Sequence, residues 1–435
     1  MRKMKDSGNP WFGSIPDSWY LKRIKYLFHI KKDIAGEDGH TVLSITQKGI
    51  IPKDLSKNEG QLAESYANYQ LVKTGDFAMN HMDLLTGWID VSKYDGVTSP
   101  DYRVFVLDDS QNNDKSYYLY LFQTCYSSRI FYGLGQGVSG LGRWRLQADK
   151  FLNFVIPVPP IAEQRAIPAY LDRQCAHIDN IIEKTKASIE EYKKLRQAVI
   201  TQAVTKGVRG DRPMKDSGIE WIGEIPEEWK VNKLKYYIDF IESGTSVKAG
   251  QNEATEGQLG VLKTSSVSKQ TFNIHENKSV NEEEYNRVSC PVKANTIIVS
   301  RMNTPELVGA CGYVDCDYPN IYLPDRLWQV HFLNNINVKF VFYWLVSSGI
   351  RFYYASLAVG TSSSMQNISQ DQFYNAFCTI PSYTEQEKIA AYLDQKCAEI
   401  DTLIAKKEAF LTELETYKKS MIYEYVTGKK EVPQA

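Results

Sequence analysis

The stretch MKDSGIEWIGEIPEEW, residues 214–229, decides the fold of this chain because it repeats the opening stretch MKDSGNPWFGSIPDSW, residues 4–19. Residues 4–26 align with residues 214–236 without a gap, and 12 of the 23 positions are identical. In the first copy the identical positions are Met4, Lys5, Asp6, Ser7, Gly8, Trp11, Gly13, Ile15, Pro16, Trp19, Lys25 and Tyr26. A chain that begins again at its midpoint is predicted to be a tandem duplication.

A second pair of matching segments lies late in each half. EQRAIPAYLDRQCAHIDNII (163–182) aligns with EQEKIAAYLDQKCAEIDTLI (385–404), and 12 of the 20 positions are identical. The first pair is offset by 210 residues and the second by 222, so the segment between them is 12 residues longer in the second half. Residues 27–156 and 237–379 share little. This pattern indicates one scaffold that presents two different surfaces.

Length and composition exclude several classes of protein. The chain has 435 residues, too many for one ordinary core, so we expect two or more domains. No apolar run approaches the roughly 20 residues of a membrane helix, and the N-terminus lacks the apolar segment of a signal peptide. Seven scattered cysteines fit a reducing compartment, so we predict a cytoplasmic protein. A formal net charge of −1 neither requires nor excludes nucleic acid.

Catalytic and metal sites have little support in the sequence. Cys311 and Cys316 are the closest cysteine pair, but no second pair completes a zinc site. FYGLGQG (131–137) imitates a cofactor-binding glycine loop, yet a helical run precedes it where a strand belongs. The chain has no GxxxxGK[ST] nucleotide loop, no paired acids and no nucleophile triad. We predict no metal, no cofactor and no catalytic residue in this chain.

Two long helices are predicted from heptad spacing of apolar residues. Residues from Glu163 to about Val204 contain no Gly and a single early Pro, and residues 385–425 have the same apolar stripe. Each helix of about 40 residues would span roughly 60 Å. The residues expected to pair the helices are Leu171, Ile178, Ile182, Ile189, Leu393, Ile400, Leu403 and Leu411. We predict an intramolecular antiparallel coiled coil with an insert at each end; the alternative is that each helix packs on its own domain.

The ends of these helices carry recognisable signals. Thr384 with Glu387 forms the pattern of a capping box before the second helix. The first copy lacks a good cap and contains Pro168, so we expect its opening turn to be kinked or to start at Pro168. Gly207 and Gly428 follow the two helices and suit chain exit.

The two inserts read as mixed α/β surfaces. Strands are predicted for residues 41–45, 75–80, 102–107, 261–266, 295–302 and 327–332. A helical run follows in each insert, at residues 115–125 and 338–349. Each insert then has a Gly/Ser-rich stretch, at 133–144 and 359–367. Such a stretch allows the backbone to approach a ligand closely, but it is equally compatible with a plain loop.

The repeated motifs resemble those of the DNA-specificity subunit of type I restriction–modification enzymes. The motifs are Trp-x-Gly-x-Ile-Pro-x-x-Trp at 11–19 and 221–229, PVPPIAEQ at 157–164 with IPSYTEQ at 380–386, and the helix ends AVTKG and YVTGK. The resemblance implies an α+β fold with two mixed α/β target-recognition domains joined by two long antiparallel helices. The expected boundaries are 1–156 for the first recognition domain, 157–213 for the central helix and linker, 214–379 for the second recognition domain and 380–435 for the distal helix.

The resemblance also implies a function. Each insert would read one half of a split double-stranded DNA sequence, and the helices would act as a ruler that places the readers one to two turns of about 34–36 Å apart. The expected partners are two methyltransferase subunits and motor–nuclease restriction subunits, which would use S-adenosylmethionine, ATP and Mg. A coiled-coil scaffold without DNA and a methyltransferase built around FYGLGQG remain as alternatives.

Candidate DNA-reading residues follow from side-chain chemistry, because Arg and Lys suit guanine and Asn and Gln suit adenine. The first insert offers Asn80, His81, Arg103, Gln136, Arg143 and Arg145, and the second offers Arg301, Asn303, Arg326, Ser364, Gln366 and Asn367. His81 and Arg301 fall at matching places after matching strands. Phosphate contacts are expected from Lys22, Arg23, Lys25, Lys31 and Lys32.

Overall fold

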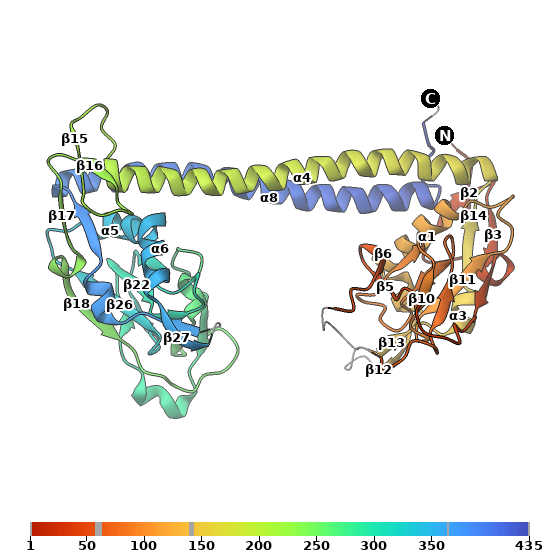
Figure 1. The fold of residues 1–435 in the computed structure, drawn as a ribbon, viewed down its shortest axis with the longest axis horizontal. Helices are drawn as coiled ribbons and strands as arrows, with labels where there is room; N and C mark the ends of the chain where they lie inside the picture. Colours follow the sequence, from red (N-terminus) through yellow and green to blue (C-terminus); the bar gives the residue numbers. More distant parts are fainter. Residues whose placement is uncertain (1, 57–62, 139–142, 363–364, 434–435) are drawn as a thin grey trace. The chain divides into compact units, whose positions relative to one another are not determined.

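The computed structural model describes residues 2–56, 63–138, 143–362 and 365–433. The chain divides into two compact units (Figure 1). The first unit contains Met1–Thr185 and Ala409–Ala435, and the second contains Lys186–Glu408. Each unit therefore includes part of both long helices, α4 (Ile161–Lys206) and α8 (Tyr383–Val426).

The first unit is built on a four-stranded antiparallel sheet. Its strand order is β4 (Phe28–Lys31), β11 (Arg103–Leu107), β8 (Phe77–Met79) and β9 (Ile89–Val91). Helix α1 (Lys115–Ser127) lies between this sheet and the long helices. The smaller elements are β1 (Met4–Asp6), β2 (Ser14–Pro16), β3 (Tyr20–Arg23), η1 (Ile24–Tyr26), β5 (Leu43–Thr46), β6 (Gly49–Pro52), β7 (Gln70–Val72), β10 (Gly96–Thr98), α2 (Ile130–Gly133), β12 (Gln136–Val138), β13 (Arg143–Arg145), α3 (Ala148–Asn153) and β14 (Val155–Val158).

Both faces of this sheet are buried, and the alternation of residues along the strands explains how. Phe105 points into a large core with Phe77 and Phe122, where ring centroids lie 5.2–6.0 Å apart. Its neighbour Val104 points to the opposite face, into a smaller core with Ala78. Because successive side chains of a strand alternate between faces, one short apolar strand can serve two cores.

The second unit repeats this sheet. Its strand order is β18 (Ile238–Ser243), β26 (Leu327–Phe332), β22 (Thr296–Ser300) and β24 (Cys311–Val314), with α5 (Val338–Val346) against it. A second sheet, β20-β19-β25-β21, covers the other face and has its own core. The further elements are β15 (Met214–Asp216), β16 (Glu224–Pro226), β17 (Lys230–Lys233), η3 (Leu234–Tyr236), β19 (Gly260–Leu262), η4 (Thr264–Val267), β20 (Asn277–Ser279), η5 (Glu282–Arg287), β21 (Pro291–Val292), β23 (Met302–Asn303), β25 (Tyr318–Tyr322), α6 (Ser348–Leu357), β27 (Val359–Ser362), β28 (Met365–Asn367), α7 (Gln370–Tyr374) and β29 (Phe377–Ile380).

Equivalent contacts fasten each sheet domain to the start of a long helix. Gln164 near the start of α4 accepts the Asp114 backbone N–H before α1 at 2.9 Å. Gln386 in α8 accepts the Asn337 backbone N–H before α5, also at 2.9 Å. About two turns further on, Asp172 accepts the hydroxyl of Tyr120 at 2.7 Å, and Asp394 does the same for Tyr343 at 2.8 Å. The repeated Glu-Gln and Leu-Asp motifs are therefore docking residues of the scaffold.

The two long helices pair in antiparallel fashion within each unit, as predicted. In the first unit the Tyr170 and Tyr425 rings lie 4.7 Å apart, and Lys418 Nζ contacts Asp179 at 2.6 Å. In the second unit Lys407 Nζ lies 5.6 Å from the centroid of the Tyr192 ring, and Arg196 Nε lies 2.9 Å from Asp401. From one contact to the next, the residue number rises in α4 and falls in α8, so the two helices are antiparallel. Asp179 and Asp401 are equivalent in the repeat, so the two ion pairs are copies of one contact.

Most of the residues predicted to pair the helices are buried or half-buried, but Leu403 is a correction. Leu171 and Leu393 each lie in the core of their own sheet domain, so the helices pack on the domains as well as on each other. Ile178, Ile189 and Ile400 are buried, and Ile182 and Leu411 are half-buried. Leu403 is 41% exposed, because a pair of helices buries a narrow stripe and the half-buried Ile404 occupies that place.

The predicted helix starts are also corrected, whereas the predicted ends are confirmed. Helix α8 begins at Tyr383, so Thr384 lies inside the first turn and is not the capping residue. Helix α4 begins at Ile161 and continues through Pro168. Gly207 and Gly428 have φ of +77° and +74°, the left-handed conformation that ends a helix at low cost.

The predicted strands and helical runs of the inserts are largely confirmed. Residues 261–266 are the exception, because β19 ends at Leu262 and a 3₁₀ turn follows from Thr264. Within the described ranges no helix combines the length and apolar character needed to cross a membrane.

Candidate nucleic-acid interface

The first group of predicted reading residues gathers where β8 ends and β11 begins. The Asn80 side chain accepts the backbone N–H groups of Met82 and Asp83 at 3.1 and 3.2 Å, so it shapes the turn after β8. The next residue, His81, accepts the backbone N–H of Leu146 through its carbonyl at 3.0 Å. This bond brings the segment after β13 against the turn after β8.

Among the predicted reading residues whose side chains the structure describes, Arg103 is the most buried, at 5% exposure. Its Nη2 donates to the Leu146 carbonyl at 2.9 Å, and its guanidinium carbon lies 5.1 Å from the centroid of the Phe151 ring. Burial lowers the pKa of Arg103 to about 10, which leaves it charged at neutral pH. No ion pair joins Arg103 to a carboxylate within the described part of the chain.

The hairpin β12–β13 adds two further candidates to the same cluster. Gln136 lies directly opposite Arg145 in the register of the hairpin. Gln136 is exposed and Arg145 is half-buried. Arg143 lies at the start of β13, and its side chain is outside the described part of the structure. Thus the structure brings His81, Arg103, Gln136 and Arg145 together from three separate segments.

A glycine of the FYGLGQG stretch makes room for a side chain of this hairpin. The chain runs from helix α2 through the glycines into strand β12, the reverse of the strand–loop–helix order of dinucleotide sites. A Cβ atom at Gly135 would lie 2.5 Å from Trp144 Nε1. The Trp144 indole donates to the Tyr132 carbonyl at 2.7 Å. The absence of a side chain at Gly135 therefore makes room for the Trp144 ring.

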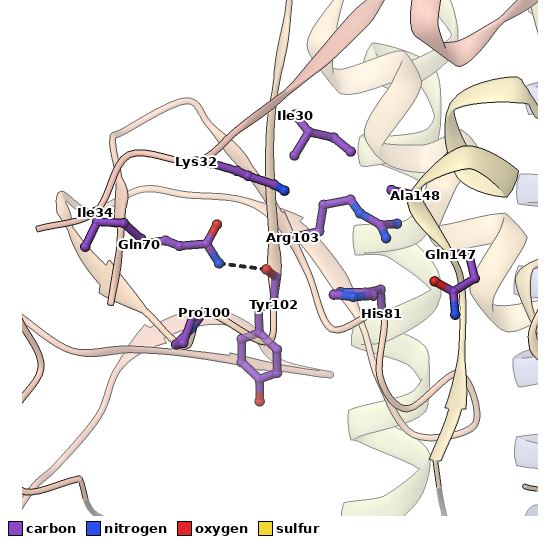
Figure 2. A pocket seen from close by; sticks show the side chains of 10 residues that line it. All are labelled: Ile30, Lys32, Ile34, Gln70, His81, Pro100, Tyr102, Arg103, Gln147 and Ala148. Atoms are coloured by element: carbon purple, nitrogen blue, oxygen red, sulfur yellow. Dashed lines mark hydrogen bonds between the residues drawn. The ribbon is translucent and has the colours of Figure 1, made fainter. Parts of the chain in front are cut away.

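A pocket of about 350 Å³ opens beside this cluster (Figure 2). Its lining residues are Ile30, Lys32, Ile34, Gln70, His81, Pro100, Tyr102, Arg103, Gln147 and Ala148. Figure 2 shows Arg103, His81 and Gln147 on one side and Gln70 and Ile34 on the other, with the Lys32 side chain extending between them. Gln70 Nε2 donates to the Tyr102 carbonyl at 2.8 Å and fixes that wall. None of the described residues that line the pocket is acidic.

The electrostatic state of His81 follows from this environment. Burial is the main cause that lowers the His81 pKa to about 4, and the nearby charges of Arg103 and Arg145 lower it further. His81 is therefore a neutral imidazole at physiological pH. Its Nδ1 is buried and has no hydrogen-bond partner among the described residues.

The second group of candidates lies at the equivalent place in the second unit. Arg301 accepts the Ile368 backbone N–H through its carbonyl at 3.0 Å, as His81 accepts that of Leu146. Its own backbone N–H donates to the Arg326 carbonyl at 3.1 Å. In the pairing of β23 with β28, Asn303 lies opposite Gln366. The structure thus places residues from three distant segments side by side.

Solvent exposure differs among these residues. Arg326 and Asn367 are exposed, while Arg301 and Gln366 are half-buried. The Asn303 side chain accepts the Thr304 backbone N–H at 2.9 Å, and its amide nitrogen donates to Ser300 Oγ at 3.4 Å, so both ends of the amide have partners within the protein. Ser364 lies outside the described residues. Sequence spacing alone offered no signal for the strand pairing that unites this group.

The basic residues predicted for phosphate contacts differ in their exposure and in their partners. Lys22 and Arg23 lie on β3, which pairs with β14, and both are exposed together with Lys25. Lys31 is half-buried and contacts Asp76 at 2.9 Å, so its charge is already compensated. Lys32 is exposed and lines the pocket. Gln70, Tyr102 and Gln147 were missed, because nothing in their local sequence indicates that they share a pocket.

Metal binding finds no support in the described residues, which contain no group of three His, Cys, Asp or Glu side chains placed to hold an ion.

Comparison with known proteins places this geometry in context. A family model described as the type I restriction modification DNA specificity domain matches residues 44–191 and again residues 226–413. The MjaVIII type I restriction enzyme specificity subunit of Methanocaldococcus jannaschii is 30% identical over 316 residues, which cover 72% of this chain and 70% of that protein. The EcoKI specificity subunit of Escherichia coli K12 is 26% identical over 258 residues, 57% of this chain and 52% of the relative.

Two solved structures share the fold. One, described as the structural basis of complex assembly and conformational transition of the type I R-M system, is 15% identical with a TM-score of 0.72 and covers 96% of this chain and 99% of its own. The HsdS subunit from Thermoanaerobacter tengcongensis is also 15% identical, with a TM-score of 0.53, and covers 96% and 98%.

Proposed function

This chain belongs to the type I restriction–modification DNA specificity family, and on that premise we propose that its two units read the two halves of a split DNA sequence. The chain is a DNA-recognition component and supplies specificity rather than catalysis. The proposal concerns how recognition is divided along the chain and with which partners it operates.

The proposal rests on one observation. The same four-stranded sheet occurs in both units, but the residues at equivalent positions of the two sheets differ. The strand orders β4-β11-β8-β9 and β18-β26-β22-β24 are equivalent. After the third strand of each sheet, the first unit has the neutral His81 and the second has Arg301. A neutral imidazole and a guanidinium suit different base edges, so the two units would prefer different half-sites.

The long helices would set the distance between the half-sites. Helix α4 has 46 residues, which corresponds to about 70 Å of continuous helix. One turn of DNA is about 34–36 Å, so a helix pair of this length suits half-sites separated by one to two turns. Lengthening both helices by whole heptads should lengthen the unread spacer and leave the half-sites unchanged.

Partners would supply the chemistry. We expect two methyltransferase subunits to bind this chain and transfer methyl groups from S-adenosylmethionine to adenine, and motor–nuclease subunits to use ATP and Mg for cleavage. The support is the relatives' description as subunits of type I restriction enzymes and the complex assembly named for one structural neighbour.

Mapping of methylated adenines in the host genome, with and without this gene, tests the function. We expect one bipartite sequence to lose methylation when the gene is removed. Replacing residues 27–156 with the equivalent insert of a relative should then change one half-site alone. Changes in both halves would contradict the division of labour, and a purified complex that shifts no DNA at moderate salt would favour a scaffold without DNA.

A further inference from the structure

The pocket beside β11 contains a buried positive charge that no carboxylate of the described residues neutralises. Arg103 is 5% exposed, and its contacts are a backbone carbonyl, an aromatic ring and the sulfur of Met79 at 3.8 Å. Burying a cation is costly unless it is paired, and no carboxylate pairs with Arg103 among the described residues. A buried polar atom that has no hydrogen-bond partner among the described residues, His81 Nδ1, lies in the same wall.

The second unit has an uncharged residue at the position equivalent to Arg103, so the fold does not require a charge there. In the first sheet Phe105 lies opposite Phe77 and Leu107 lies opposite Phe28. In the second sheet Val330 lies opposite Ile297 and Phe332 lies opposite Ile238. Counting two residues back from Phe105 and from Val330 makes Arg103 the counterpart of Trp328.

Trp328 fills its place as an ordinary core residue. Its ring lies 5.8 Å from that of Phe373, just as the Arg103 guanidinium lies 5.1 Å from the Phe151 ring. Trp328 is 2% exposed. The scaffold therefore accepts an apolar side chain at this position, and the first unit has an arginine there that points into a pocket.

From these contacts we propose that the pocket of the first unit binds one phosphodiester group of the target DNA, with Arg103 and Lys32 as the cationic contacts and Gln147 as a polar contact. This inference rests on the proposed DNA-reading function and assigns Arg103 a positioning role instead of base reading. A phosphodiester carries the full negative charge that a buried guanidinium requires, whereas a base edge offers only partial charges.

The concave shape of the pocket also favours a phosphodiester as its ligand. Base edges lie at the floor of the major groove, about 8.5 Å deep, and are reached by protruding side chains rather than by recessed ones. Phosphates lie on the outside of the duplex and can enter a concave site. The volume of about 350 Å³ lies within the range of roughly 300–1,000 Å³ of small-ligand pockets.

The salt dependence of DNA binding tests the proposal. The full chain, assembled with its methyltransferase partner, is titrated with its target duplex and with a random duplex at several salt concentrations. We expect Arg103→Met to weaken binding to both duplexes by roughly 10- to 100-fold and to reduce the slope of log Kd against log salt by about 1, with unchanged sequence preference. Lys32→Gln should change the slope in the same direction.

Lys93→Gln is the matched control, because Lys93 is exposed in the same unit and does not line the pocket. Its salt slope should equal that of the wild type. An unchanged slope in Arg103→Met and Lys32→Gln, in a complex that still binds its target, would overturn this proposal alone. A change of base preference at one position would assign Arg103 to base reading. A wild-type complex that binds no DNA would overturn the proposed function as well.

A methylphosphonate scan gives a second readout that does not depend on the folding of Arg103→Met. Replacing single phosphates of the first half-site by neutral methylphosphonates should identify one position where the wild type loses affinity and Lys32→Gln loses less. Inorganic phosphate added at constant ionic strength distinguishes a free anion as the ligand. Competition by inorganic phosphate together with a flat methylphosphonate scan would contradict a DNA phosphodiester.

Discussion

The indole N–H of Trp19 donates to the carboxylate of Glu163 at 3.0 Å across 144 residues of sequence. Trp229 donates to Glu385 at 3.1 Å in the second unit. Both carboxylates also pair with an arginine that lies over the same indole ring, Arg2 for Glu163 at 2.6 Å and Arg212 for Glu385 at 2.7 Å. These contacts join the repeated Trp motif to the repeated Glu-Gln motif, which explains why both survived in the two copies.

Removing one of these carboxylates should destabilise the protein, and more so in the second copy. The Glu385 side chain is 7% exposed and that of Glu163 is 32% exposed, so Glu385→Gln disrupts the more deeply buried ion pair, while Arg212 keeps Glu228 at 3.0 Å as a second partner. We expect a loss of about 2–3 kcal/mol in the free energy of unfolding for Glu385→Gln and about 1 kcal/mol for Glu163→Gln. Urea unfolding measures both. Glu191→Gln, at an exposed pair with Lys194, should change nothing measurable.

Truncation along the long helices should distinguish buried from exposed apolar positions. Leu171→Ala and Leu393→Ala remove fully buried side chains and should each cost about 2–5 kcal/mol. Leu403→Ala removes the same atoms from an exposed face and should leave the melting temperature nearly unchanged. Thermal unfolding of the three variants checks this, and a large effect of Leu403→Ala would place that residue in a contact the structure lacks.

Gly207, which follows α4, should be required for two reasons: its backbone conformation favours glycine, and a side chain would not fit there. Gly207 has φ +77°, and a Cβ atom there would lie 1.9 Å from Arg212 Nη2. We expect Gly207→Ala to cost about 1–2 kcal/mol from backbone strain alone, with a further loss if the Arg212–Glu385 pair moves. Gly210→Ala is the control, since open space surrounds that position among the described atoms. Equal effects of the two substitutions would contradict this account.

The neutral state of His81 predicts an acid-sensitive first unit. The His81 pKa is lowered from 6.5 to about 4 in the folded protein, so between these values the unfolded chain binds more protons. Stability should therefore fall as pH falls from above 6.5 toward 4. In His81→Gln the contribution of His81 to this loss should vanish. Melting temperatures of the wild type and the variant at pH 7 and at pH 5 measure that contribution. A His81 NMR resonance that titrates near 6.5 would contradict the prediction.

Substitutions in the second unit should change the sequence preference at only one half-site of the DNA. Arg301 and Gln366 lie on paired segments, because Gln366 pairs with Asn303 and the Arg301 carbonyl accepts the Ile368 backbone N–H. If they read bases, Arg301→Ala and Gln366→Ala should each cost about 1–3 kcal/mol of discrimination at single positions of the second half-site. Methylation assays on a library of half-site variants measure this. Uniform weakening on all sequences would indicate phosphate contacts.

Prediction from sequence succeeded where a property depends on neighbours along the chain. The duplication, the long helices, the strands at 102–107 and 327–332 and the glycines that end the helices all follow from local periodicity and conformational preference. The errors are of a different kind. Thr384 and Leu403 were assigned from patterns that fit several registers, and only the partner surface decides which register is used.

What the sequence by itself determined is the repeated scaffold, because two segments recur with many identical residues, one 210 and the other 222 positions later, and similar segments adopt similar local structure. What only the tertiary structure decided is the chemistry of the two reading surfaces. Arg103 and Trp328 occupy one equivalent position, and His81 is neutral because burial and two arginines from distant segments act on it. Such effects arise from strand pairing and desolvation across long stretches of chain, which no local pattern encodes.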